Sequence, residues 1–296
     1  MPELPEVEAL KRSLEKVLLN TTIRKISVLR DKIVSSSGTV RTADPIKVDE
    51  FVTAPIGQKI VSLTRRAKNI MINLSGGGVL LVHLKMTGQL VFVSNSGEQT
   101  TGGHPIQNQI LPNKHTYIIF DLNRGELFYN DVRQFGYVLY YPSMQTIIDT
   151  GHFEKLGTEP LSKDFVLEDF EKRLTQKSGI LKTVLLDQSV VVGCGNIYCD
   201  EVCFASGVLP TRKCNSLTYL EVTRIYTEIK RILNFAVLEG GSSVANYLLA
   251  DGSKGNYAHY HLVYGKKNKP CVICGKLLES IKITGRTTVF CTNCQK

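Results

Sequence analysis

The chain has 296 residues, of which 43% are hydrophobic, and it carries 36 Lys and Arg against 27 Asp and Glu. This length suggests two or three domains, and the apolar content excludes a disordered chain. The longest apolar runs are too short for a membrane span, and acidic residues stand where a secretory leader would need basic ones. The net charge of +9 favours a polyanionic partner such as nucleic acid. We therefore expect a cytoplasmic, nucleoid-associated protein with no membrane contact.

The first half of the chain predicts one helix followed by strands. Apolar residues recur at helical spacing over residues 4–18, which indicates an amphipathic helix. β-type segments separated by Gly and Asn clusters then predict an antiparallel sandwich or barrel. Its strands are expected at 23–29, 58–64, 69–74, 79–85, 89–93, 116–121, 126–130 and 137–141. The Gly- and Asn-rich stretch 94–113 is expected to be a long exposed loop.

From about residue 145 to 240 the apolar period is helical. The candidate helices are 167–174, 180–186, 196–206 and 217–239, and Asn196 is expected to cap the third. Gly193 and Gly195 permit a close backbone approach, so a phosphate could sit at this turn and helix N-terminus; a structural helical hairpin is the alternative. Four cysteines of this region are expected to be reduced and buried, namely Cys194, Cys199, Cys203 and Cys214. A polar loop is expected at 243–261.

The most specific signal lies at the end of the chain. Cys271 and Cys274, then sixteen residues, then Cys291 and Cys294 have the spacing of a zinc ribbon. Four thiolates leave no open coordination position, which indicates one structural Zn²⁺; a pair of disulfides is the alternative. Two short strands between the pairs would carry Arg286 at the tip of a hairpin, where it could bind a phosphate or simply be solvated.

The N-terminus is a candidate nucleophile. The small residue Pro2 permits removal of Met1, which would expose a secondary amine with a pKa near about 8. Attack of such an amine on an aldehyde-level carbon gives an iminium ion, which acts as an electron sink for elimination. Glu3, directly beside it, could donate a proton. The alternative is that Pro2 and Pro5 merely precede a helix whose first turn favours acidic residues.

Several further motifs occur along the chain in a characteristic order. They are PELPEVE at 2–8, RRAK at 65–68, HLKMTG at 83–88, DVRQFG at 131–136, LGTEPLS at 156–162, GNIYCDE at 195–201, GGSS at 240–243, and VYGKKNKPCVICG through GRTTVFCTNCQK at 263–296. With these motifs the chain resembles bacterial formamidopyrimidine-DNA glycosylases over essentially its whole length. The endonuclease VIII branch of the same superfamily is similar in layout but typically has Gly where this chain has Leu4.

The resemblance implies a role for each matching residue. Pro2 would attack the sugar C1′ and release the damaged base, Glu3 would act as the acid, and Lys68 would serve β-elimination and phosphate contact. Arg286 would bind phosphate and aid δ-elimination. The base must leave the stack, and the residues implied to fill the gap are Met86, Arg133 and Phe135. Without the resemblance, Met86 and Phe135 would be assigned to a core, and Lys68 to a solvated strand edge.

The remaining implied contacts are with phosphates and with the extruded base. The residues matching phosphate-binding positions are His115, Lys177 and Asn196, although the KHDH of the family reads KHTY around His115. Lys254 and Tyr257, in the loop that would cover the base, could contact it. Cys194, at a position often aliphatic, and the long 94–113 loop also depart from the family pattern.

The sequence therefore predicts an α+β multidomain protein that acts as a monomer on damaged double-stranded DNA. An N-terminal helix and antiparallel β-sandwich would occupy 1–143, a helix-two-turn-helix domain 144–262, and a four-cysteine zinc ribbon 263–296. The expected activity is that of a bifunctional glycosylase and abasic-site lyase for oxidised purines. The alternatives are an endonuclease VIII-like enzyme for oxidised pyrimidines and a non-catalytic, zinc-dependent binder of damaged DNA.

Overall fold

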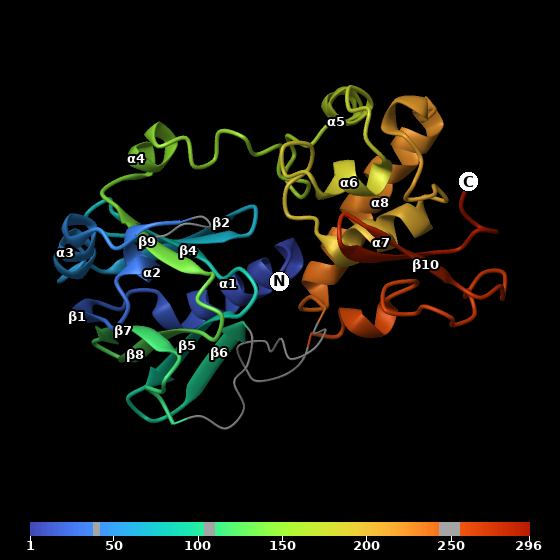
Figure 1. The fold of residues 1–296 in the computed structure, drawn as a ribbon. Coiled ribbons are helices and arrows are strands. Elements are labelled where there is room, and N and C mark those ends of the chain that lie inside the picture. Colours follow the sequence, from blue (N-terminus) through green and yellow to red (C-terminus); the bar gives the residue numbers. More distant parts are fainter. Residues whose placement is uncertain (38–41, 104–109, 243–254) are drawn as a thin grey trace. The chain divides into compact units, whose positions relative to one another are not determined.

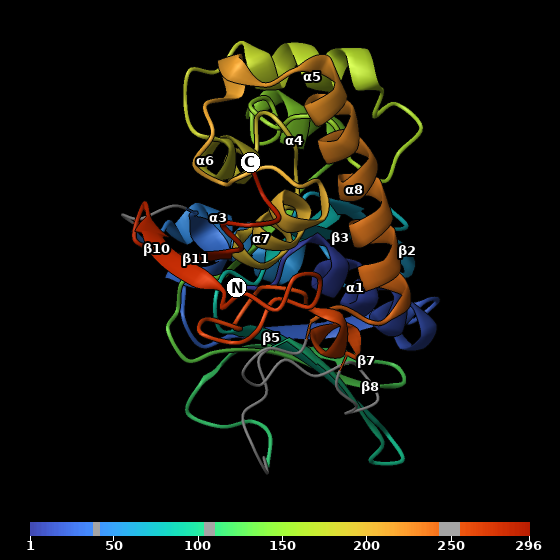
Figure 2. The same cartoon turned by 90° about the vertical axis from the view of Figure 1, so that its right-hand side faces the viewer.

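The computed structural model describes residues 1–37, 42–103, 110–242 and 255–296 and divides the chain into two compact units. The first unit comprises Met1–Pro2, Glu6–Glu154 and Gly240–Gly255. The second comprises Glu3–Pro5, Lys155–Glu239 and Asn256–Lys296. The first is rich in strands, and the second consists mainly of helices with one β-hairpin (Figures 1 and 2).

The first unit is built on helix α1 and two antiparallel sheets. Helix α1 (Leu4–Leu18) places Leu10, Leu14 and Leu18 in the core at 0% exposure, as its apolar spacing predicts. The larger sheet has the order β1-β7-β8-β5-β6 and the smaller one β2-β3-β4-β9. Their strands are β1 (Ile23–Val28), β2 (Ile60–Arg66), β3 (Asn69–Leu74), β4 (Val79–His83), β5 (Gly88–Ser94), β6 (Gln99–Gly103), β7 (Thr116–Leu122), β8 (Gly125–Asp131) and β9 (Tyr137–Tyr141).

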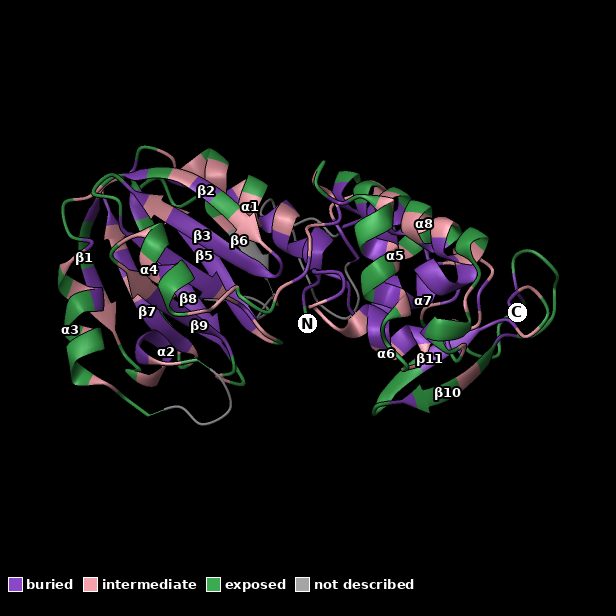
Figure 3. Cartoon of the chain, turned by 90° about the horizontal axis from the view of Figure 1, so that it is seen from above, coloured by how far each residue is buried: buried purple, intermediate pink, exposed green. Residues whose placement is uncertain are grey.

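Alternating side chains of the smaller sheet serve two different cores. Ile72 of β3 and Leu80 of β4 join α1 and the larger sheet in the main core. Met71 and Leu81, one residue along, join Ile147 of α4 (Met144–Asp149) in a second apolar cluster. Figure 3 shows the strands of this unit as largely buried. Both faces of these strands are therefore buried, and their sequences are nearly continuous apolar runs. The predicted antiparallel sandwich is confirmed.

One loop prediction is wrong, and three short helices were not predicted. Part of the expected 94–113 loop is β6 (Gln99–Gly103), which pairs antiparallel with β5 at the edge of the sheet. Its Gln, Thr and Gly residues show no apolar alternation, so the strand depends on pairing with β5. These helices are α2 (Lys32–Ser35), α3 (Pro45–Thr53) and α4 (Met144–Asp149). Helix α3 had a readable signal, because Asp44 caps the backbone N–H groups of Ile46 and Lys47.

The second unit contains four principal helices, α5 (Leu167–Thr175), α6 (Leu181–Leu186), α7 (Asn196–Ala205) and α8 (Tyr219–Leu238). All four match predicted helices within about two residues at each end. Helix α8 begins with a capping box in which Thr218 and Glu221 bond reciprocally. The four middle cysteines are buried and free, as predicted.

A two-stranded hairpin completes the second unit. It consists of β10 (Glu279–Ile283) and β11 (Arg286–Phe290), and Val289 of β11 shares an apolar cluster with Phe204 of α7. Side-chain packing in this cluster therefore holds the hairpin to α7.

In the described part of the chain, no helix has the length and apolar character needed to cross a bilayer.

Candidate active site

The carboxylate of Glu3 occupies the N-terminus of α7. Its Oε2 accepts hydrogen bonds from the backbone N–H of Gly195 at 2.7 Å and of Tyr198 at 3.4 Å, and its Oε1 accepts one from Ile197 at 3.0 Å. Glu3 is only 3% exposed. The positive end of the helix dipole and three backbone donors thus hold a buried acid in one orientation, directly after Pro2 in the chain.

Two glycines make this arrangement possible. A Cβ on Gly195 would lie 2.4 Å from Cδ of Glu3, and a Cβ on Gly193 would lie 2.4 Å from Cβ of Leu4. Gly193 also has a left-handed φ of 84°, and its carbonyl accepts a hydrogen bond from the N–H of Leu4 at 3.0 Å. The close approach expected at these glycines therefore exists, but its occupant is the N-terminal segment of the chain itself.

Two sequence predictions at this turn are wrong. Gly195, not Asn196, is the N-cap residue of α7, and the capping acceptor comes from Glu3, far away in sequence. Because three N–H groups of this helix end already bond to Glu3, they do not form the phosphate cradle that the glycines suggested. The Nδ2 of Asn196 donates instead to the backbone carbonyl of Thr287 in β11, at 3.1 Å.

Arg286 is the first residue of β11 and is exposed. The preceding residues Thr284 and Gly285 both have left-handed φ angles, of 47° and 78°, and so form the tight turn of the hairpin. Arg286 pairs with Ile283 across this turn. Its guanidinium therefore sits at the end of a short, paired hairpin, where an Arg can bind a phosphate.

The four tail cysteines form a site that fits zinc. Their sulfur atoms all lie within 4.8 Å of one another; Sγ of Cys271 and Cys294 are 3.9 Å apart, and Sγ of Cys274 and Cys291 are 3.5 Å apart. Tetrahedral coordination with Zn–S bonds of about 2.3 Å places sulfurs roughly 3.8 Å apart. The four free thiols of this cluster fit one structural zinc, as predicted, and do not form disulfides.

Lys68 lies in the turn between β2 and β3, not on a solvated strand edge. It is 7% exposed and follows Ala67, whose φ is 53°. Nη1 of Arg65 donates to the carbonyl of Ala67 at 2.9 Å, and Nε of Arg65 donates to the carboxylate of Glu8 on α1 at 3.0 Å. The RRAK turn is therefore tied to the helix that follows Pro2 and Glu3 in the chain.

His83 lies near the positive charges of Lys68 and Lys85, and its imidazole is neutral. Burial lowers the pKa of His83 to about 3, and the positive charges of Lys85 and Lys68 act in the same direction. Its Nδ1 accepts a hydrogen bond from the backbone N–H of Lys85 at 3.0 Å. A neutral imidazole leaves the local positive charge to the two lysines, which suits a polyanionic ligand.

Met86, Arg133 and Phe135 come together at the surface of the first unit. Met86 is 42% exposed and Phe135 is 48% exposed, so neither belongs to the core. The guanidinium of Arg133 lies 4.5 Å from the ring centroid of Phe135, and its Nη1 is 3.1 Å from Sδ of Met86. Large exposed apolar side chains around a cation are typical of wedges that enter a base stack. We call these three side chains the wedge cluster.

The other predicted DNA contacts are more dispersed. His115 is half-buried, and its carbonyl accepts from the N–H of Asp131, at the end of β8. Lys177 forms an exposed ion pair with Asp187 at 3.2 Å. Tyr257 is 3% exposed, with its ring packed near those of Tyr198, Phe235 and His261, so little of the ring is available to a base. Lys254 lies outside the described residues.

Sequence reasoning missed three buried acids that organise the surroundings. Glu6 accepts from the N–H of Ser242 at 2.7 Å, and Glu201 accepts from three successive N–H groups at 262–264. Asp200 pairs with Lys182 at 2.5 Å and accepts from the N–H of Val289 in β11 at 3.2 Å. The signal was present, since acidic residues inside otherwise apolar helical patterns are seldom buried without partners.

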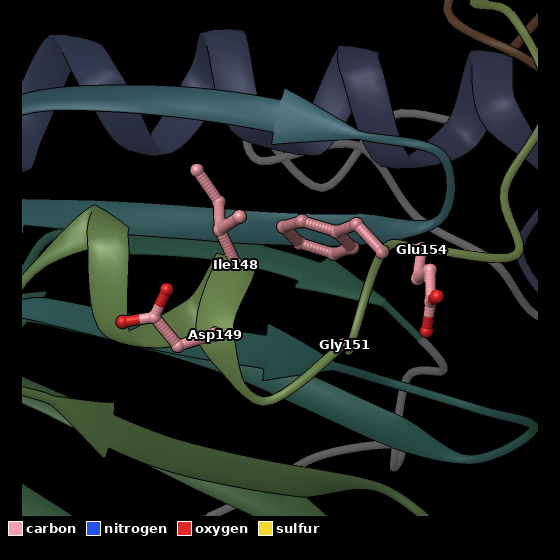
Figure 4. A pocket seen from close by; sticks show the side chains of 5 residues that line it. Ile148, Asp149, Gly151 and Glu154 are labelled. Carbon is pink, nitrogen blue, oxygen red and sulfur yellow. The ribbon is translucent and has the colours of Figure 1, made fainter.

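One hollow lies apart from all of these residues. It has a volume of about 460 Å³ and is lined by Ile148, Asp149, Gly151, Phe153 and Glu154, at the end of α4 and just after it. Figure 4 shows the Asp149 and Glu154 carboxylates pointing away from each other. They therefore do not form the paired carboxylates of an acid–base site.

Comparison with known proteins agrees with this geometry. Three protein-family models match the chain. The formamidopyrimidine-DNA glycosylase N-terminal domain matches residues 1–138, the formamidopyrimidine-DNA glycosylase H2TH domain matches residues 156–247, and the zinc finger found in FPG and IleRS matches residues 268–296. The formamidopyrimidine-DNA glycosylase of Listeria monocytogenes is 38% identical over 100% of both chains. This chain belongs to the formamidopyrimidine-DNA glycosylase family.

Other relatives extend the comparison to solved structures. The Carboxydothermus hydrogenoformans formamidopyrimidine-DNA glycosylase is 35% identical over 100% of both chains. A mutant Lactococcus lactis FPG in complex with Fapy-dG-containing DNA is 29% identical over 100% of both chains, with a TM-score of 0.86. The MutM (FPG) protein of Thermus thermophilus is 32% identical, covers 99% of this chain and 98% of its own, and has a TM-score of 0.82. The similarity therefore spans the whole chain and includes both described units.

Proposed function

We propose that this protein is a bifunctional DNA glycosylase and abasic-site lyase that removes oxidised purines, namely 8-oxoguanine and formamidopyrimidines, from duplex DNA during base excision repair. The observation that carries this function is the full-length relationship to formamidopyrimidine-DNA glycosylases, one of them solved with Fapy-dG-containing DNA. We propose that the protein acts as a soluble monomer in the cytoplasm or at the nucleoid, because its proposed substrate is chromosomal DNA. The division at 1–143, 144–262 and 263–296 is supported by the three separate family models.

The proposed chemistry starts at Pro2. After removal of Met1, the Pro2 nitrogen attacks the sugar C1′, and the damaged base leaves with the electron pair of its bond to C1′ and takes up a proton, while the nitrogen loses its own. The nitrogen lone pair then opens the C1′–O4′ bond to give the iminium ion, and O4′ takes up a proton. Glu3, whose carboxylate bonds to the N-terminus of α7, would deliver the proton for base departure or ring opening. The iminium then accepts the electron pair that is released during β-elimination, a step that Lys68 assists. Arg286 binds the phosphate that leaves in the subsequent δ-elimination. Zinc has no chemical step in this scheme and supports the hairpin that carries Arg286.

DNA contact is assigned to residues on both described units. The wedge cluster would fill the gap left by the extruded base, with Arg133 as the donor to the orphaned opposite base. His115, Lys177 and Asn196 would contact phosphates, although Asn196 also bonds to Thr287. Tyr257 is buried, with its ring packed near those of Tyr198, Phe235 and His261, so its contribution to base contact would be indirect, through packing.

The first test is covalent trapping with sodium borohydride. A duplex containing 8-oxoguanine opposite cytosine should yield a reduced adduct that maps to Pro2 by mass spectrometry, and Pro2→Gly should lower the yield while DNA binding is retained. Unchanged cleavage by Pro2→Gly would contradict the assignment of the nucleophile. Trapping only with an oxidised pyrimidine would place the enzyme with endonuclease VIII. Binding with no adduct on either lesion would indicate a non-catalytic binder of damaged DNA.

A further inference from the structure

A buried carboxylate lies beneath the wedge cluster. Asp131, at the end of β8, is 0% exposed. Its Oδ1 accepts from the hydroxyl of Thr87 and from the backbone N–H of Arg133, the latter at 3.2 Å. Its Oδ2 accepts from the backbone N–H of Gly136 at 2.7 Å and faces the hydroxyl of Tyr129 at 3.5 Å. One side chain thus bonds to two different turns of the chain.

These two turns carry all three members of the wedge cluster. Thr87 directly follows Met86 in the segment between β4 and β5, while Arg133 and Phe135 lie in the segment between β8 and β9. The hydroxyl of Thr87 also accepts from the backbone N–H of Arg133 at 3.0 Å. Thr87 and Asp131 therefore link the segment of Met86 to the segment of Arg133 at the backbone, below the exposed side chains.

The Arg133 segment has a backbone that needs this support. Gln134 has a left-handed φ of 56°, which is unfavourable for a residue with a side chain. Gly136 leaves no room for substitution, because a Cβ there would lie 2.0 Å from the Tyr129 hydroxyl and 2.8 Å from the carbonyl of His83. A buried acceptor that bonds to the N–H groups on either side of Gln134, at Arg133 and Gly136, compensates for such local strain.

We propose that Asp131, together with Thr87, is the positioning residue that sets the geometry of the wedge cluster and thereby the discrimination of the base opposite the lesion. The inference rests on the proposed role of Met86, Arg133 and Phe135 in filling the gap. Because Asp131 is fully buried, its proposed role is through the backbone of Arg133 and not through direct contact with DNA. Discrimination between opposite bases depends on how the guanidinium donors of Arg133 meet the edge of the base. A small shift of the turn that carries Arg133 would remove this discrimination.

The test uses binding, so that it does not depend on catalysis. The full-length zinc protein is titrated against duplexes that hold an uncleavable tetrahydrofuran abasic analogue opposite C or opposite A, and the ratio of the two Kd values is measured. The wild type should prefer one opposite base by about fivefold or more, and Asp131→Asn should bring the ratio to within about twofold of unity. In the isosteric Asn, an NH₂ group would face the N–H of Gly136 or Arg133 instead of accepting from it.

A second pair of variants addresses folding. Thr87→Val removes the hydroxyl link but leaves the carboxylate with its backbone donors. It should therefore bring the ratio of the two Kd values closer to unity with little change in Tm. Thr87→Ser, which keeps the hydroxyl, should keep the wild-type ratio. The core variant Ile72→Val is the matched control, with a lowered Tm and an unchanged ratio. A wild-type ratio in both Asp131→Asn and Thr87→Val, or no opposite-base preference in the wild type, would overturn the inference. Loss of trapping at Pro2 would instead overturn the proposed function and leave this ratio unaffected.

Discussion

At the residue scale, the least expected feature is that Glu3, the proposed acid, also has an architectural role. Its carboxylate caps the N-terminus of α7, whose N-cap residue is Gly195, almost two hundred positions later in the chain. Ionisable groups at functional sites are commonly held by backbone dipoles in this way, because such dipoles need no reorganisation during the reaction. The orientation of the acid is therefore set by the backbone of α7 and by the absence of a side chain at Gly195.

Gly195→Ala tests this arrangement. Gly195 has φ −138°, which alanine adopts without strain, so the only penalty is the new Cβ beside Cδ of Glu3. We expect kcat for base release to fall about 100-fold while DNA binding changes little, since displacement of a catalytic group by about 1 Å costs roughly that factor. Single-turnover kinetics measures the effect. Gly179→Ala, which meets only a methyl group of Val184, is the control, and equal rates in both variants would argue against a fixed Glu3.

The lowered pKa of His83 predicts a pH dependence of stability. Its pKa in the folded chain is about 3, below the ordinary value of 6.5, so between these values the unfolded chain binds more protons. Stability contributed by neutral His83 is therefore complete above about pH 6.5 and is lost as the pH falls toward about 3. At pH 5 the loss relative to pH 7 should be about 1–2 kcal/mol.

Urea unfolding at several pH values checks this expectation. His83→Asn should flatten the decline between pH 7 and pH 5, whereas His259→Asn, at an exposed position, should leave it unchanged. His261, whose pKa burial lowers to about 4, contributes in the same direction in the second unit, so some decline will persist in the variant. A slope that is the same in His83→Asn and the wild type would show that His83 is charged in the native protein.

At the scale of elements, the β10–β11 hairpin depends on two kinds of support. The zinc cluster closes it at one end, and α7 holds it through Asn196 to Thr287 and Asp200 to Val289. Burial raises the pKa of Asp200 to about 6, and the facing Lys182 opposes that shift. Without metal, the four thiols have little reason to stay together, and the ordered position of Arg286 should be lost.

Removal of zinc should therefore weaken DNA binding. Chelation, or Cys274→Ser, is expected to raise Kd for lesion duplexes about tenfold or more, with zinc content measured by mass spectrometry on the same samples. Cys214→Ala, which changes a buried cysteine outside the cluster, should retain one zinc per chain and near-normal binding. Full affinity in protein that contains no zinc would contradict the role given to the hairpin.

At the scale of the whole molecule, the net charge of +9 points to phosphate as the main contributor to affinity. Three cations are assigned to phosphates, namely Lys68, Lys177 and Arg286. With about three contacts, the logarithm of the binding constant should fall against the logarithm of the salt concentration with a slope of about −2.7, which lowers the binding constant about 40-fold between 50 and 200 mM. Titrations at four salt concentrations measure this slope.

A matched pair of variants localises the contribution. Lys177→Ala should reduce the magnitude of the slope by about one, because its exposed ion pair with Asp187 is weak enough to be exchanged for a phosphate. Lys47→Ala, which removes an exposed lysine of α3 that bears no proposed DNA contact, should leave the slope unchanged. Equal slopes for Lys177→Ala and the wild type would remove Lys177 from the contact set.

Much of the fold was readable because it depends on local periodicity. The stripe of Leu10, Leu14 and Leu18, the short apolar runs around Ile72 and Leu80, and the CxxC pairs each indicate burial or metal ligation by their own spacing. Strand β6 was not readable, since its pairing with β5 leaves no apolar pattern in Gln99–Gly103. The candidate site was named chiefly through resemblance, because single residues such as Met86 and Phe135 fit a core equally well by composition.

By itself, the sequence determined the fold class, the zinc ligands and the positive charge, since these are properties of spacing and composition, and its motifs identified the family by resemblance. The tertiary structure decided what those residues meet. It placed Glu3 on α7 where a phosphate was expected, buried Tyr257, and exposed Met86 and Phe135 around Arg133. It also showed Asp131 beneath that cluster. The physical reason is that hydrogen-bond partners distant in sequence are fixed only when the packed chain brings a donor and an acceptor within about 3 Å of each other.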